Sequence, residues 1–179
     1  MTTSPPTIDG GLNEWAALSG VTLDSGTANY RQPTAGAITT KATFKCAWDA
    51  AALYVSGTIT DSVVISSTQG VYAQDSAVIG IDGRGDGQNR PLQDEHQIAI
   101  TAANKVMDMM TYPVVHTSAV VVSGVGWTFE MRIPQAVIAW PMGEGGIIGL
   151  TWEIYDKDTG DAYWSGHLVS DKFAGRELP

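Results

Sequence analysis

The chain has 179 residues. At this length one domain buries roughly 70% of the surface that its unfolded chain exposes, so it does not need disulfide bonds to be stable. Its formal net charge is −9, and the sequence has no cluster of Lys and Arg residues. The negatively charged phosphate backbone of a nucleic acid would therefore be repelled, which excludes nucleic acid as the expected partner. No run of about 18 apolar residues exists, which excludes insertion into a membrane as a helix. The N-terminus lacks the basic and apolar regions of a secretion signal, so we expect a chain that is not exported by that route or is numbered after processing.

The first elements are short. A turn at residues 8–11 precedes a helical turn at 12–15, which Asn13 is expected to cap. Residues 19–40 are rich in Ser, Gly, Thr and Ala and have little apolar periodicity. We therefore expect a long rim loop there, with one short strand near 21–23.

Three later segments, residues 41–48, 53–60 and 127–133, have an apolar residue at every second position. A period of two places the side chains on one face of each strand in a core and leaves those on the other face exposed to solvent. The inward positions are Ala42, Phe44, Cys46, Trp48, Leu53, Val55, Gly57, Ile59, Trp127, Phe129, Met131 and Ile133. The outward positions include Tyr54, Ser56, Thr128 and Glu130.

The remaining predicted strands are residues 76–82, 95–101, 105–111, 114–122, 147–155 and 162–168. Pro134 favours one helical turn over 134–138, and Pro141 ends it. Many short strands separated by Gly, Asp and Asn clusters predict an all-β protein. We expect one domain over residues 1–179, a two-sheet antiparallel β-sandwich of the jelly-roll-like or immunoglobulin-like kind.

A predicted Gly-rich hairpin contains four acidic residues, Asp82, Asp86, Asp94 and Glu95. Carboxylate oxygens on a flexible loop are what calcium needs, but the complete Asp-x-Asp-x-Asp-Gly pattern with a distal Glu is missing. We favour a solvated loop.

Two further acidic groups occur along the chain. Asp156, Asp158 and Asp161 flank Thr-Gly and are interpreted as hairpin-turn residues. Asp61 and Asp75 bound one connection, and we expect them to lie at the same rim and to brace the loop by accepting backbone N–H bonds.

No catalytic motif is recognisable. His96, His116 and His167 are far apart without metal-type spacing, and no nucleophile elbow is present. The single cysteine, Cys46, lies at an inward position and is interpreted as a small buried hydrophobe. Nothing in the sequence places two carboxylates across a cleft for glycoside hydrolysis, so we expect no enzyme.

Eight landmarks run nearly end to end through the chain. They are IDGGLNEW at 8–15, AWDAAALYVSGTITD at 47–61, YAQDSAVIGID at 72–82, DEHQIAI at 94–100, GWTFEMRIP at 126–134, GGIIGLTWEIYDKD at 145–158, YWSG at 163–166 and KFAG at 172–175. In order and spacing the set resembles the family 9 carbohydrate-binding modules. The resemblance implies a two-sheet sandwich without catalytic residues that binds sugars at one rim and often holds structural calcium. No motif requires a cofactor, and a structural calcium ion is the one option that the resemblance leaves open.

In that family two aromatic rings sandwich the apolar faces of a sugar, and charged and amide side chains take its hydroxyl groups. Tyr72 stands where the family carries its first ring, although it is also interpretable as an ordinary loop aromatic. Residues 167–171, the counterpart of the loop that supplies the second ring, hold no aromatic residue. Trp164 is the nearest substitute, with a place in the core as the favoured alternative.

The family's polar positions are altered. Its carboxylate falls on Val78, and its Arg and amide positions fall on Ala99 and Thr101. Hydrogen bonds to charged groups are worth about 1.5 to 3 kcal/mol each, so these changes predict a modified sugar site. The candidate ligand-binding residues are Tyr72, Trp164, Gln97 and Thr101, and no metal ligand is assigned.

The sequence therefore predicts a non-catalytic module that binds a carbohydrate or glycan at a rim near Tyr72. The alternative is a structural or decoration protein that uses the same sandwich as a display unit on a virion or other large assembly. Both hypotheses place the chain outside the cell or on a virion surface, and a homo-oligomer or a large assembly remains open.

Overall fold

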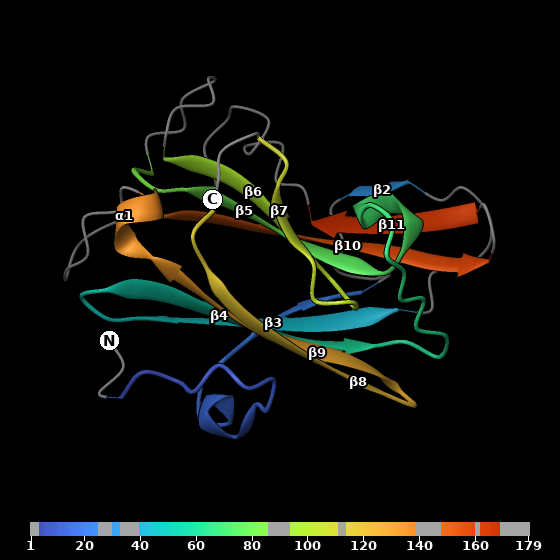
Figure 1. Cartoon of the computed structure of the whole chain (residues 1–179), viewed down its shortest axis with the longest axis horizontal. Coiled ribbons are helices and arrows are strands. Elements are labelled where there is room, and N and C mark those ends of the chain that lie inside the picture. Colours follow the sequence, from blue (N-terminus) through green and yellow to red (C-terminus); the bar gives the residue numbers. More distant parts are fainter. Residues whose placement is uncertain are drawn as a thin grey trace.

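Two antiparallel β-sheets lie face to face in the computed structural model of the chain (Figure 1). One sheet has five strands in the order β1-β3-β4-β9-β8, and the other has six in the order β2-β11-β10-β5-β6-β7. The structure describes residues 4–24, 30–32, 40–85, 94–110, 114–138, 148–159 and 162–168, without the side chains of residues 30–32, 72, 158, 159 and 162–168. The predicted two-sheet antiparallel sandwich is confirmed.

The five-stranded sheet contains β1 (Val21–Leu23), β3 (Lys41–Trp48), β4 (Ala52–Thr60), β8 (Thr117–Ser123) and β9 (Gly126–Pro134). The six-stranded sheet contains β2 (Tyr30–Gln32), β5 (Ser76–Asp82), β6 (Glu95–Thr101), β7 (Val106–Asp108), β10 (Gly149–Thr159) and β11 (Ala162–Leu168). Short helical segments are η1 (Asn13–Trp15), η2 (Val71–Ala73) and α1 (Gln135–Ile138). Among the described residues, no helix is long and apolar enough to cross a membrane.

The core lies between the sheets and includes the predicted inward positions, of which Cys46 and Trp48 are only partly buried. Phe44 of β3 stacks on Trp152 of β10 with ring centroids 4.7 Å apart, which joins the two sheets directly. Gly57 of β4 pairs with Phe129 of β9, and a Cβ at Gly57 would lie 2.2 Å from a carbon of the Phe129 ring. The ring therefore fills the space that a side chain at Gly57 would need.

The outer face of the five-stranded sheet is less exposed to solvent than the alternation of apolar and polar residues predicts. Tyr54, Ser56 and Glu130 were expected to face water, but each is at most 2% exposed. The N-terminal segment with η1 lies across this face (Figure 1), and Trp15 packs there against Tyr54. A period of two shows which residues share a face of a strand. It does not show whether that face is exposed to solvent, because residues distant in sequence can cover it.

Several element boundaries differ from the sequence prediction. The loop at residues 19–40 contains β2 in addition to the expected β1, and β7 is shorter than predicted. Asn13 lies inside η1, and the residue at the N-cap is Leu12, which makes no side-chain capping bond. The helical turn α1 is confirmed.

Cys46 packs against the core and is partly buried. Burial raises the pKa of its thiol, as expected for a residue that acts as a small hydrophobe rather than as a nucleophile.

Candidate functional site

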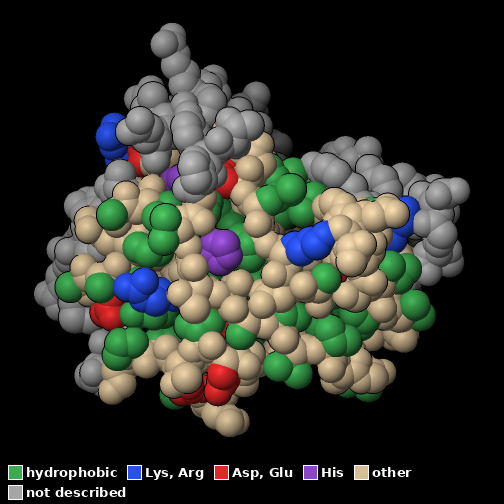
Figure 2. Space-filling model, in the orientation of Figure 1, with side chains coloured by type: hydrophobic (Ala, Val, Ile, Leu, Met, Phe, Trp, Pro, Cys, Tyr) green, Lys and Arg blue, Asp and Glu red, His purple; other side chains and the backbone are tan. Residues whose placement is uncertain are grey.

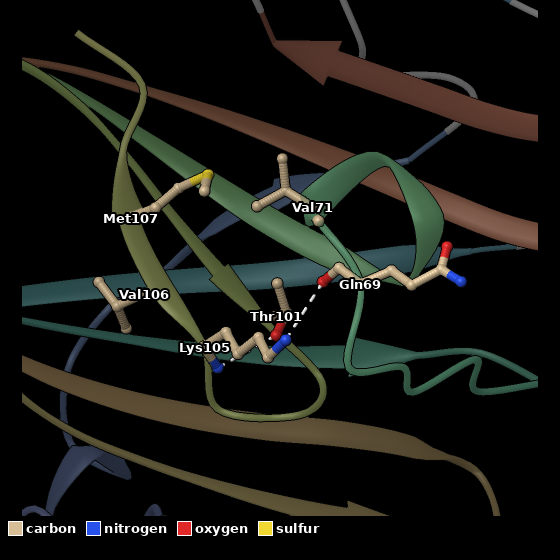
Figure 3. Close-up of a pocket in the computed structure, with 7 residues that line it drawn as sticks. Gln69, Val71, Thr101, Lys105, Val106 and Met107 are labelled. Carbon is tan, nitrogen blue, oxygen red and sulfur yellow. Dashed lines mark hydrogen bonds between the residues drawn. The ribbon is translucent and has the colours of Figure 1, made fainter. Parts of the chain in front are cut away.

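A cavity of about 240 Å³ lies beside η2, at the turn that connects β6 to β7. Its lining residues are Gln69, Gly70, Val71, Thr101, Lys105, Val106 and Met107. They come from two segments distant in sequence: the loop before β5 supplies one wall, and the end of β6 with β7 supplies the other (Figure 3).

The walls of the cavity are mainly apolar. The side chains of Val71 and Met107 face one another across it (Figure 3). Val71 is 5% exposed and packs on the outer face of the sheet, while Met107 is 46% exposed. An apolar surface beside open solvent is suited to the hydrophobic face of an amphipathic ligand.

Lys105 joins the two walls. Its backbone N–H donates to Thr101 Oγ1 at 3.1 Å, and its ammonium donates to the backbone carbonyl of Thr68 and to that of Gln69 at 3.5 Å. The turn before Lys105 places Asn104 at φ 55°, a left-handed conformation in which Asn is enriched. The turn therefore places Lys105 where its side chain reaches the carbonyls of Thr68 and Gln69 on the opposite wall.

The structure brings only part of the predicted sugar site together. Thr101 lines the cavity and is fully buried. Tyr72 follows Val71 in η2, but its side chain lies outside the described part of the structure. Trp164 pairs through its backbone with Asp156, and its side chain is also outside the described part.

Gln97 lies elsewhere on β6 and does not line the cavity. Four residues along a strand separate it from Thr101 by about 13 Å. Its amide donates to Glu153 Oε1 at 3.3 Å, and the Tyr155 hydroxyl donates to the other oxygen of Glu153 at 3.1 Å.

Apolar residues occupy the positions at which the resemblance implies charged groups. Val78 and Ala99 pair across β5 and β6 and are both 0% exposed. They cluster with Val71 and Tyr155, and Met109 packs against them. The floor beside the cavity is therefore hydrophobic.

Sequence reasoning missed Gln69, Val71, Lys105 and Met107 as lining residues. Each is unremarkable in its own segment, because the cavity arises only when the loop before β5 meets β7. A signal was available in the resemblance, which placed Tyr72 and Thr101 at one site although they are distant in sequence.

A second feature is a group of three buried carboxylates, Asp61, Asp75 and Asp156, in which one oxygen atom from each residue lies within 4.8 Å of the others. Burial, reinforced by the charges of Asp61 and Asp156, raises the pKa of Asp75 to about 7 against the lowering effect of its backbone hydrogen bonds. The predicted bracing role of Asp61 and Asp75 is confirmed, since they accept the N–H groups of Val63 and Ile65. Asp156 was interpreted as a turn residue, but it lies within β10 because that strand continues to Thr159.

The other acidic positions form no such group among the described residues. Asp82 Oδ1 accepts the backbone N–H groups of Arg84 and Gly85 at 3.2 and 2.8 Å, and Arg84 Nε lies 3.7 Å from Asp94 Oδ2. Asp86 and Asp161, with the side chain of Asp158, lie outside the described residues.

The described histidines bond to the surrounding fold. His96 Nδ1 lies 2.6 Å from Asp108 Oδ2, and its Nε2 lies 2.9 Å from the Val137 carbonyl, which links β6 to β7 and α1. His116 Nδ1 lies 2.9 Å from the Val114 carbonyl. On the visible face of the molecule, Lys and Arg side chains are scattered rather than gathered into one patch (Figure 2).

Comparisons with known proteins agree with this architecture. The fold matches a family 9 carbohydrate-binding module from Caldicellulosiruptor kristjanssonii in complex with cellotriose, with a TM-score of 0.80 and 20% identity over 97% of this chain and 88% of that one. A structure of a family 9 module from the same organism in complex with glucose gives 0.77 and 21% over 98% and 92%. A putative carbohydrate-binding protein from Bacteroides uniformis ATCC 8492 gives 0.54 and 12% over 100% and 89%.

A search of curated protein sequences finds no match. The sequence profile of the carbohydrate family 9 binding domain-like family matches residues 8–172. The chain therefore belongs to the carbohydrate family 9 binding domain-like family.

Proposed function

We propose that this protein is a non-catalytic carbohydrate-binding domain that holds a sugar ring in the cavity beside Tyr72. The observation that carries the proposal is the cavity itself, with apolar walls at Val71 and Met107 and a polar edge at Thr101 and Lys105. A sugar ring has apolar C–H faces and a rim of hydroxyl groups, which matches this division of the lining.

The chemistry of Lys105 supports the proposal. An ammonium has three N–H donors, and the carbonyls of Thr68 and Gln69 use two of them. One donor remains for a sugar hydroxyl. The seven described lining residues contain no Asp or Glu, so they do not supply the pair of carboxyl groups that glycoside hydrolysis ordinarily uses.

The size of the cavity favours a short ligand. Its volume of about 240 Å³ is below the roughly 300–1,000 Å³ of pockets that enclose drug-sized molecules. One sugar ring, such as the end of a chain, is the expected occupant. The structures that the fold matches hold glucose and cellotriose, and these are the first sugars to test. We propose that the domain acts outside the cell, where it would meet polysaccharides that contain such sugars.

Isothermal titration calorimetry against glucose, cellotriose and other oligosaccharides tests the proposal. We expect saturable heat for at least one sugar, and at least a ten-fold weaker affinity for Met107→Ala, because the variant removes one apolar wall. Val122→Ala is the matched control, since Val122 is similarly exposed at 48% but lies on β8 of the other sheet.

Absence of heat with every sugar, together with no retention on insoluble glycans, would contradict the proposal. The same oligosaccharides incubated with the protein should remain intact. Measurable turnover that a carboxylate substitution abolishes would overturn the non-catalytic assignment.

A second candidate role is that of a display unit in a virion or other large assembly. The edge strand β8 and the turn after it favour this role, because Val121, Val122 and Val125 are 47%, 48% and 73% exposed. Gel filtration of the purified chain and imaging of its native source test it. A monomer that is absent from any particle would eliminate this candidate.

A further inference from the structure

The edge of the cavity carries a positive charge. Lys105 is an exposed lining residue, and its ammonium donates to the backbone carbonyls of Thr68 and Gln69, which are neutral groups. Among the described residues, no carboxylate forms an ion pair with Lys105. The charge of this lysine is therefore available to a ligand in the cavity.

The acidic residues closest in sequence to the lining segments are directed elsewhere. Asp108 follows Met107, but its side chain is 0% exposed and its Oδ2 lies 2.6 Å from His96 Nδ1. Asp75 follows η2 and is 2% exposed, and its two oxygens accept backbone N–H groups at 2.6 and 2.7 Å. Neither carboxylate belongs to the lining of the cavity.

The other polar side chains of the lining offer few acceptors. The Gln69 amide points away from the remaining lining residues (Figure 3), and Thr101 Oγ1 already accepts the backbone N–H of Lys105 at 3.1 Å. A sugar hydroxyl has a hydrogen of its own that needs an acceptor, whereas an ionised carboxylate only accepts. A hydrogen bond from an ammonium to a carboxylate is also charge-assisted and stronger. The lining therefore suits an anionic group better than a hydroxyl group.

We propose that the ligand of this cavity is a uronic acid unit, a sugar ring whose C6 is a carboxylate, and that Lys105 binds this carboxylate. The inference rests on the proposed function, because Val71 and Met107 are again taken to contact the C–H faces of the ring. The carboxylate lies on the rim of the ring, where the third N–H of the ammonium can reach it. A volume of about 240 Å³ accommodates one such unit.

The overall charge of the chain does not oppose this assignment. The formal net charge is −9, but at physiological ionic strength exposed charges farther apart than about 8 Å are largely screened from one another. An ammonium in direct contact with the ligand therefore outweighs carboxylates elsewhere on the surface.

Isothermal titration calorimetry of the full chain with methyl β-D-glucuronide and methyl β-D-glucoside tests the inference. The two probes differ only at C6, which is a carboxylate in the first and carries a hydroxyl in the second. We expect the glucuronide to bind at least ten-fold more tightly. Raising sodium chloride from about 50 mM to about 500 mM should weaken glucuronide binding several-fold and change glucoside binding by less than about two-fold, because salt screens the attraction between two charges.

Variants of Lys105 assign the preference to its charge. Lys105→Gln replaces the ammonium with a neutral amide that still has N–H donors, and should bring the two affinities within about two-fold of each other. Lys105→Arg keeps the charge and should keep the preference. Lys41→Gln is the matched control and should also keep it, because Lys41 is likewise exposed but lies on β3 of the other sheet. Near-ultraviolet circular dichroism verifies that each variant folds, and the salt dependence of the unmodified protein needs no variant.

Equal affinities for the two probes, or tighter binding of the glucoside, would overturn the inference and leave the proposed function intact. A glucuronide preference that survives in Lys105→Gln would also overturn it, since the carboxylate would then be bound elsewhere. The absence of heat with the glucuronide, while a neutral oligosaccharide binds, would overturn the inference alone. The absence of heat with every sugar would overturn the proposed function as well.

Discussion

Glu130 is the residue that most clearly departs from its sequence pattern. It occupies an outward position of β9, yet it is fully buried. Its carboxylate accepts the backbone N–H groups of Asp9 and Gly10 at 2.9 and 2.7 Å and the indole N–H of Trp15 at 2.7 Å. One side chain thus attaches the N-terminal segment to the outer face of the five-stranded sheet.

Glu130→Gln should lower the free energy of unfolding by about 2 to 4 kcal/mol, because hydrogen bonds to a charged acceptor are worth about 1.5 to 3 kcal/mol each. The amide also points a donor at groups that are donors themselves. Urea unfolding measures the change. Glu14→Gln is the control and should change stability by less than about 0.5 kcal/mol, because Glu14 is exposed and accepts the Thr7 N–H at 3.2 Å. Equal stabilities of the two variants would contradict this role of Glu130.

At the scale of elements, the pairing of β4 with β9 determines how the core closes. Gly57 lies opposite Phe129, whose ring packs beside those of Phe44 and Trp127 at centroid distances of 6.3 and 5.8 Å. The glycine is needed here for space rather than for backbone freedom. Overpacking of a filled core costs about 1–3 kcal/mol.

Gly57→Ala should therefore destabilise the protein by about 2 kcal/mol, and the loss should be smaller when Phe129→Leu is already present. A double-mutant cycle in urea measures this coupling. Gly124→Ala is the control, because a Cβ there meets no atom within 4 Å. Additive effects of the two core substitutions would show that the ring does not occupy the space beside Gly57.

The elements that the sequence predicted correctly are those with a period of two, such as β3, β4 and β9. The pattern was weaker where a strand is short, as in β2, or polar, as in β10 around Asp156. The sequence also could not assign the burial of Glu130, since its partners lie near the N-terminus. Asp61, Asp75 and Asp156 were found separately in the sequence, but only the packing of the two sheets brings the third to the first two.

At the scale of the whole molecule, the acidic group and the cavity share the connection at residues 61–75. Asp61 and Asp75 brace the two ends of this connection by accepting the N–H groups of Val63 and Ile65. The cavity wall at Gly70 and Val71 therefore belongs to a loop that is attached to the sandwich at both ends.

The central claim is that the cavity between η2 and β7 receives the sugar. Two-dimensional amide NMR of the full chain, titrated with the sugar that gives heat in calorimetry, tests it most directly. The account predicts that the shifting signals concentrate at Gly70, Val71, Thr101, Lys105 and Met107. Shifts confined to β8 or to the N-terminal segment, or a spectrum unchanged at saturating sugar, would contradict it.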